Sequence, residues 1–209
     1  NSARNALRFL LRARKIRSIW LPRLLCEVIE EACRVENVEI RYYPVDASLR
    51  PVFLPEIART EWVYLINYYG QYQKSEICEW AEQFHLILDN VQAFYTKPLD
   101  GLDTVYTCRK FFGVPDGAYL YTESVLPEEL EQDSSCTRLE YLMGRFEHSA
   151  NAFYGAYQQH EEQLGTLPIR WMSKGTHNLL RTIDYERAKH ARENNFAYLH
   201  KGFGAVNRL

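Results

Sequence analysis

Two residues at the ends of apolar segments carry the side chains best suited to chemistry. Asp89 directly follows the apolar run Leu86–Leu88, where loss of water makes a lone carboxylate costly unless a cation meets it. Lys110 follows the segment Asp103–Thr107 and opens a turn rich in aromatic residues, glycine and proline. An amine in such a turn can act as a nucleophile. On the residues alone, a helix-capping aspartate and a solvated surface lysine are at least as good an interpretation.

Alternating helices and strands must position these two residues. Hydrophobic periodicity and turn signals predict strands at residues 18–21, 38–42, 62–66, 85–88, 104–107 and 118–122, and helices at 3–14, 24–33 and 74–84. This alternation is typical of an α/β domain with a mostly parallel sheet, which binds ligands at the carboxyl ends of its strands. Beyond Pro127, the segments 138–164 and 176–209 are expected to form long polar helices.

Composition indicates a folded globular chain. Of the 209 residues, 46% are hydrophobic, 14% aromatic and 25% charged, with a net charge of −2. No apolar run approaches the roughly 20 residues that span a bilayer, so no membrane association is expected. The five cysteines include no Cys-x-x-Cys pair. We therefore expect neither disulfides nor a zinc site, and we place the protein in a reducing cytoplasm.

Several familiar sites are absent from the sequence. It contains no dinucleotide-binding glycine motif, phosphate-binding loop or serine-nucleophile elbow. The six histidines do not have the spacing of metal ligands, so no metal is expected. Seven basic residues precede the first acid, Glu27, which would suit a transit peptide or a nucleic-acid arm. The stripe of Leu7, Leu10 and Leu11 favours an ordinary helix with a solvated basic face, and nucleic-acid binding is not expected.

Five segments together resemble a known family. In chain order they are Ser2–Leu7, Ile66–Gly70, Asp89–Gln92, Thr107–Gly117 and Ile183–Tyr198. Their succession is similar to that in the pyridoxal-phosphate-dependent aminotransferases of fold type I, in particular the DegT/StrS type, which act mostly on nucleotide-linked keto sugars. The resemblance implies a three-layer αβα sandwich like the large domain of aspartate aminotransferase, with a mostly parallel, seven-stranded sheet and long helices at the C-terminal end.

The resemblance also implies roles for individual residues. Lys110 would be the catalytic residue and would hold pyridoxal phosphate as a Schiff base, while Asp89 would pair with the protonated pyridine nitrogen. The other cofactor contacts would come from Val91 beneath the ring, Gln92 and Asn67 near its phenolic oxygen, and Thr107 with the backbone amides of Ala3 and Arg4 at the phosphate. Family members usually place an aromatic residue on the other ring face, where this chain has Leu25 or Cys26.

The implied activity is transfer of an amino group from an amino-acid donor to a keto acceptor by a homodimer. Two alternatives stay open, namely a pyridoxal-phosphate-dependent sugar dehydratase and a non-catalytic interaction domain. By the same resemblance, residues 1–175 form the cofactor-binding large domain, and residues 176–209 form a long helix that leads toward a small C-terminal domain. We expect the chain to be the large-domain portion of a longer protein.

Overall fold

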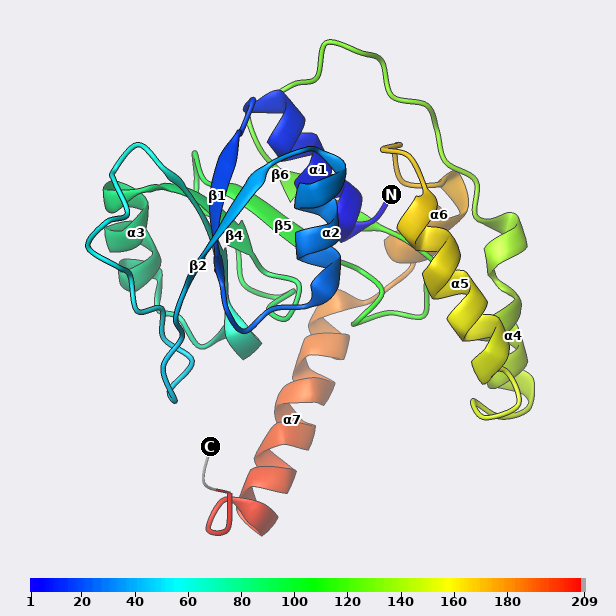
Figure 1. The fold of residues 1–209 in the computed structure, drawn as a ribbon. Coiled ribbons are helices and arrows are strands. Elements are labelled where there is room, and N and C mark those ends of the chain that lie inside the picture. Colours follow the sequence, from blue (N-terminus) through cyan, green and yellow to red (C-terminus); the bar gives the residue numbers. More distant parts are fainter. Residues whose placement is uncertain (208–209) are drawn as a thin grey trace.

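Six strands form one sheet at the centre of the computed structural model, which describes residues 1–207 (Figure 1). The strand order is β2-β1-β3-β4-β5-β6, and every neighbouring pair is parallel except β5 and β6, which are antiparallel. The strands are β1 (Ser18–Pro22), β2 (Glu39–Tyr43), β3 (Trp62–Ile66), β4 (His85–Asp89), β5 (Asp103–Thr107) and β6 (Ala118–Tyr121). The expected mostly parallel sheet is confirmed. The expectation of seven strands is wrong for these residues.

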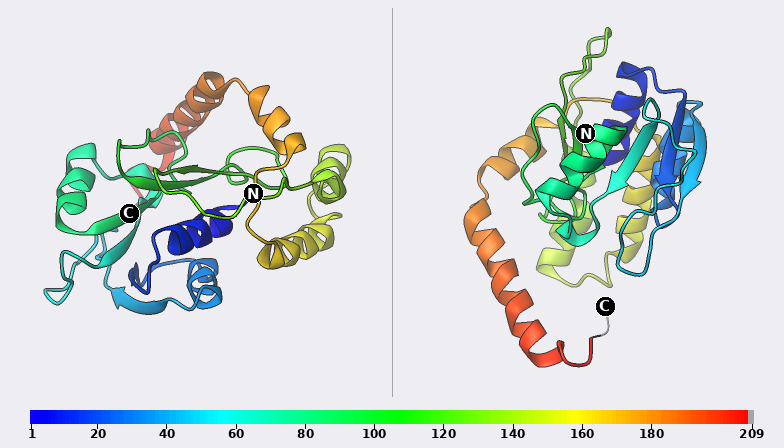
Figure 2. Two further views of the ribbon diagram at one scale, coloured as in Figure 1. Left: turned by 90° about the horizontal axis from the view of Figure 1, so that it is seen from above. Right: turned by 90° about the vertical axis from the view of Figure 1, so that its left-hand side faces the viewer.

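Helices cover both faces of the sheet. Along the sheet, the step from β1 to β2 leads toward one edge, and the step from β3 to β4 leads toward the opposite edge. Because parallel crossovers are right-handed, the connecting helices α2 (Glu27–Val35) and α3 (Lys74–Gln83) fall on opposite faces. The first helix, α1 (Ala3–Ala13), packs against α2, β5 and β6, and Figure 2 shows it on the α2 side, opposite α7. The result is the three-layer αβα architecture.

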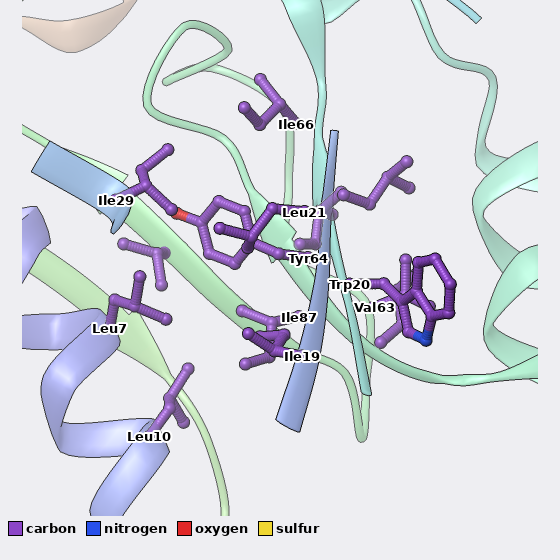
Figure 3. Packing of buried hydrophobic residues seen from close by; sticks show 14 of the residues in the cluster. Leu7, Leu10, Ile19, Trp20, Leu21, Ile29, Val63, Tyr64, Ile66 and Ile87 are labelled. Atoms are coloured by element: carbon purple, nitrogen blue, oxygen red, sulfur yellow. The ribbon is translucent and has the colours of Figure 1, made fainter. Parts of the chain in front are cut away.

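The main hydrophobic core lies between the sheet and α1 with α2 (Figure 3). Leu7 and Leu10 of α1 pack over Ile19 and Ile87 of the sheet, and all four side chains are buried. All five residues of β5 are buried, as expected for a strand covered on both faces. This core fixes the carboxyl ends of β4 and β5 side by side.

The basic residues of α1 are paired with acids from elsewhere in the fold. Glu36 accepts hydrogen bonds from Arg8 and Arg12, each through Nε at 2.7 Å. Arg14 forms a two-pronged pair with Asp103 at 2.9 and 3.0 Å. The expected amphipathic helix with Leu7, Leu10 and Leu11 on its buried face is confirmed, but its basic face is only partly solvated, since the Arg8 side chain is paired and largely covered.

The long helices expected at the C-terminal end are confirmed, with α7 (Tyr185–Phe203) the longest, but each of the two predicted segments is divided into two helices. The first becomes α4 (Glu140–Glu147) and α5 (Tyr154–Thr166), and the ring of Phe153 occupies the space that a Cβ on Gly144 would fill. The second becomes α6 (Lys174–Arg181) and α7 (Tyr185–Phe203); its last two expected residues, 208 and 209, lie outside the described part. Asp184 accepts a hydrogen bond from Arg187 N at 2.9 Å, capping a new helix there. Short 3₁₀ turns occur at Tyr68–Gly70 and Cys136–Arg138.

Helix α7 differs from the other helices in its surroundings. It has no buried residue over Tyr185–Phe203 and extends away from the sheet in Figure 1. Its N-terminal half is joined to the body by Arg192, which donates to Phe111 O and lies over the Phe111 ring. Within residues 1–207, no helix has the length and apolar character needed to cross a bilayer.

Candidate active site

The carboxyl ends of β4 and β5 open into a small cavity, here called the inner cavity, of about 210 Å³. Asp89 is the last residue of β4, Thr107 is the last of β5, and Lys110 follows three residues later. Since β4 and β5 are parallel neighbours, these ends meet at one edge of the sheet. Six of the eight residues implied by the sequence resemblance line this cavity: Ala3, Arg4, Asp89, Val91, Thr107 and Lys110.

A second, larger space adjoins the inner cavity and is here called the outer groove. It has a volume of about 680 Å³ and shares Asp89, Val91 and Lys110 with the inner cavity. Gln92 lines the outer groove, and its Oε1 atom is buried with no hydrogen-bond partner. The Lys110 side chain is exposed and reaches both spaces. A ligand attached to this amine would therefore have room on two sides.

Asp89 is the buried charge of the site, with only 1% of the residue exposed. Its carboxylate accepts two hydrogen bonds, one from the Tyr64 hydroxyl at 2.8 Å and one from Val91 N at 2.7 Å. Burial nevertheless raises the pKa of Asp89 to about 6, while these two bonds and the charge of Lys110 act in the opposite direction. The carboxylate is thus desolvated and incompletely compensated, which favours a cationic ligand group beside it.

Positive groups also line the inner cavity. Helix α1 begins there, with Ala3 and Arg4 in its first turn, and the first amides of a helix favour anions. Arg4 and Arg109 both line the cavity, and the Nε–H of each is buried with no partner. Arg4 pairs with Glu31 at 3.2 Å and Arg109 with Glu161 through their terminal nitrogens. Their Nε donors remain available for an anion.

Asn67 is not brought to the site. Its side chain is fully buried and donates to Asn90 Oδ1 at 3.0 Å, while its Oδ1 accepts from Tyr72 N at 3.3 Å. Asn90 in turn donates to the Tyr106 hydroxyl at 3.1 Å. Asn67 lines neither the inner cavity nor the outer groove. Its bonds instead fix the turn that follows β3.

Two site residues were not singled out from the sequence. Tyr64 carries a hydroxyl in the otherwise apolar strand β3, and that polar atom is the signal that could have identified it. Arg109 immediately precedes Lys110, but its contribution depends on packing against Glu161 of α5, which is distant in sequence. In residues 1–207, no group of three or more His, Cys, Asp or Glu side chains is placed to hold a metal ion.

These residues fit pyridoxal phosphate, which carries an anionic phosphate at one end and a basic ring nitrogen at the other. The unpartnered Nε atoms of Arg4 and Arg109 and the start of α1 suit the phosphate. The buried carboxylate of Asp89 suits a protonated ring nitrogen. The apolar ring would lie among Cys26, Ile29 and Val91, which line both spaces.

Several solved structures have a fold similar to that of this chain. Bna3p of Saccharomyces cerevisiae, a kynurenine aminotransferase candidate, matches at 10% identity with a TM-score of 0.54, over 98% of this chain and 53% of that one. L-threonine-O-3-phosphate decarboxylase from Porphyromonas gingivalis is 17% identical, with a TM-score of 0.47, over 81% and 55% of the two chains. The sugar aminotransferase CalS13 from Micromonospora echinospora is 17% identical, with a TM-score of 0.43, over 57% and 39%.

The match to Bna3p confirms the aminotransferase-like fold, and at this identity it establishes the fold alone. This chain spans about 39 to 55% of the length of these three structures. No protein-family model and no curated protein matches the sequence.

Proposed function

We propose that the protein is a pyridoxal-phosphate-dependent aminotransferase, which moves an amino group from an amino-acid donor to a keto acceptor through Lys110. The observation that carries the proposal is the shared lining of the inner cavity: the amine of Lys110, the buried carboxylate of Asp89 and the start of α1 all face one space. The order of the five sequence motifs supports the DegT/StrS type, and with it a cytoplasmic homodimer.

Pyridoxal phosphate, when bound, supplies a carbonyl that links to amines and a ring that withdraws electrons from the carbon next to the amino group. Lys110 would hold the group through Nζ and, once free, carry a proton at that atom. Asp89 would accept a hydrogen bond from the ring nitrogen and keep it protonated, while Tyr64 and Val91 N orient the carboxylate. Arg4, Arg109 and Thr107 would hold the phosphate.

The test is to titrate the purified chain with pyridoxal phosphate, reduce it with borohydride and locate the modified residue by peptide mass analysis. The wild type should turn yellow, and the label should lie on Lys110. Lys110→Ala should remove both signals, whereas the matched variant Lys97→Ala, at an exposed lysine that lines neither space, should keep them. A wild type that binds no cofactor would refute the proposal in favour of a non-catalytic domain.

Product analysis separates the remaining alternative. With an amino donor such as glutamate and a keto acceptor, an aminotransferase yields a new amine and a keto acid from the donor. A dehydratase yields a product that has lost water and consumes no donor. Size-exclusion chromatography of the same sample tests the proposed homodimer, since a monomeric elution volume would refute it.

A further inference from the structure

Apolar side chains from four separate segments line much of the outer groove. Its walls include Leu24 from the segment after β1, Leu49 from the loop after β2, Tyr69 from the turn after β3 and Phe196 from α7. Tyr69 is 73% exposed and Phe196 is 70% exposed. Exposed aromatic residues that line one groove indicate a surface for an apolar ligand group.

The groove offers little to a multiply charged ligand. Among the described residues that line it, Lys110 is the one lysine or arginine, and the proposed function commits this amine to the cofactor. The arginines of the site, Arg4 and Arg109, line the inner cavity instead. A diphosphate or a second carboxylate would lose its water in the groove without a guanidinium to replace it.

Two wall residues are held in a backbone conformation that disfavours their side chains. Leu49 has φ 61° and Tyr69 has φ 54°, both in the left-handed region. Bulky residues rarely occupy this region, and they persist there only where surrounding contacts fix the backbone. Of the four such non-glycine residues in the described chain, these two line the outer groove, while Lys15 and Asn37 do not.

The turn that follows β3 supplies the contacts that fix the walls. Asn67 holds it from within, accepting from Tyr72 N through Oδ1 and from Gly70 N through its carbonyl oxygen at 3.3 Å each. From this turn, Tyr72 OH donates to Leu49 O at 2.6 Å and Tyr68 OH donates to Leu24 O. One buried asparagine thus organises three walls of the groove, and Asn67 is a positioning residue rather than a cofactor contact.

We infer that the outer groove is the substrate-specificity site of the reaction at Lys110, and that it takes a large uncharged side group, aromatic or branched aliphatic, against Tyr69 and Leu49. This inference rests on the proposed function for the reacting amine. The ligand inferred here differs from the nucleotide-linked sugar that the sequence resemblance implies. Leu49 also packs against the core, whereas the cost of placing the exposed Tyr69 at positive φ is explained if its side chain is retained for contact with this group.

A binding experiment on the full chain tests the inference without requiring turnover. Calorimetric titration compares phenylpyruvate with 2-oxoglutarate, which shares the keto acid but ends in a charged carboxylate, and with UDP-glucose as the sugar nucleotide. We expect phenylpyruvate to bind at least about tenfold more tightly than either. Tyr69→Gly should weaken phenylpyruvate binding about tenfold, the scale of one aromatic contact.

The variants also separate a binding role from a structural one. Glycine adopts φ 54° freely, so Tyr69→Gly should leave the melting temperature unchanged or raise it while affinity falls. Lys15→Gly is the matched control, because Lys15 has the same φ and lines neither space. It should behave likewise in stability and keep wild-type affinity. Should binding survive in Tyr69→Gly, the ring has no part in recognition and the inference fails.

The same titrations distinguish failure of this inference from failure of the proposed function. A chain that binds pyridoxal phosphate at Lys110 but prefers 2-oxoglutarate or UDP-glucose contradicts the groove assignment alone. A chain that prefers phenylpyruvate but takes up no cofactor contradicts the proposed function alone and leaves an apolar ligand site. A chain that binds none of the three probes overturns the inference.

Discussion

Replacing Asp89 by asparagine should stabilise the cofactor-free protein at neutral pH. The folded-state pKa of Asp89 is raised by burial from 3.8 to about 6. Between these two pH values the folded chain binds more protons than the unfolded chain, so the free energy of unfolding falls as pH rises. Below about pH 4 Asp89 is protonated in both the folded and the unfolded chain, so its burial does not lower the free energy of unfolding. Above about pH 6 Asp89 is ionised in both states, and the free energy of unfolding is lowered by the full cost of burying the charge.

The size of the effect follows from the two pKa values. A difference of about two units, at about 1.4 kcal/mol each, makes the ionised carboxylate cost about 3 kcal/mol at pH 7. Asp89→Asn removes this cost and keeps the local hydrogen bonds, because the amide oxygen accepts from Val91 N and the amide nitrogen donates to the Tyr64 hydroxyl. For a chain of this length, about 3 kcal/mol raises the melting temperature by about 6 to 12 °C.

Urea denaturation without cofactor at pH 4, 5, 6 and 7 measures the difference. The curves of wild type and Asp89→Asn should meet near pH 4 and separate by pH 7, with the variant more stable. Asp100→Asn, at an exposed carboxylate, should run parallel to the wild type throughout. If Asp89→Asn also runs parallel, Asp89 is not a destabilised buried charge and its assigned place beside a cation loses its physical basis. Cofactor affinity, measured separately, should fall in this variant because the ring nitrogen loses its anionic partner.

Two further changes probe the supports of the site. Arg138→Met removes the buried cation that pairs with both Asp116 and Asp133, so urea denaturation should show a loss of about 3 to 5 kcal/mol. Gly117→Ala forces an alanine to φ 108° with its Cβ at 3.0 Å from Thr176 Cγ2, which should cost about 1 to 3 kcal/mol and lower the melting temperature. Gly113→Ala, which has no heavy atom within 4 Å of its new Cβ, should show no comparable drop.

The sequence predicted those features of the site that topology alone decides. Periodicity located β4 and β5, and the rule that parallel strands end at one edge brought Asp89, Thr107 and Lys110 together. The helix predicted from residue 3 likewise begins at Ala3, where the Ser2 hydroxyl accepts a hydrogen bond from Asn5 N. Such features depend on local pattern and strand direction. They can be predicted without knowing how the side chains pack.

Features that depend on tertiary packing were not predictable in this way. The helical pattern is broken near Gly144 because the ring of Phe153 fills the space beside that glycine. Asn67 lies at the carboxyl end of a strand as Asp89 does, yet its side chain turns into a buried network with Asn90. The position after a strand therefore shows which edge a residue occupies. Which way the side chain points is decided by the hydrogen bonds that the surrounding turns leave open.

Two separate features close to the Lys110 amine lower the stability of the folded chain. Asp89 is ionised in a buried place at neutral pH, and Leu49 and Tyr69 are held at positive φ beside the outer groove. Packing against the core retains Leu49. It explains neither the buried charge of Asp89 nor the exposed ring of Tyr69, since an asparagine and a glycine would satisfy the same hydrogen bonds and backbone at lower free energy. Under the proposed function both costs would be offset: a protonated ring nitrogen would pair with Asp89, and an apolar ligand group would gain contact with Tyr69. The occurrence of such costs beside Lys110 supports the proposed enzymatic function over the alternative of a non-catalytic domain.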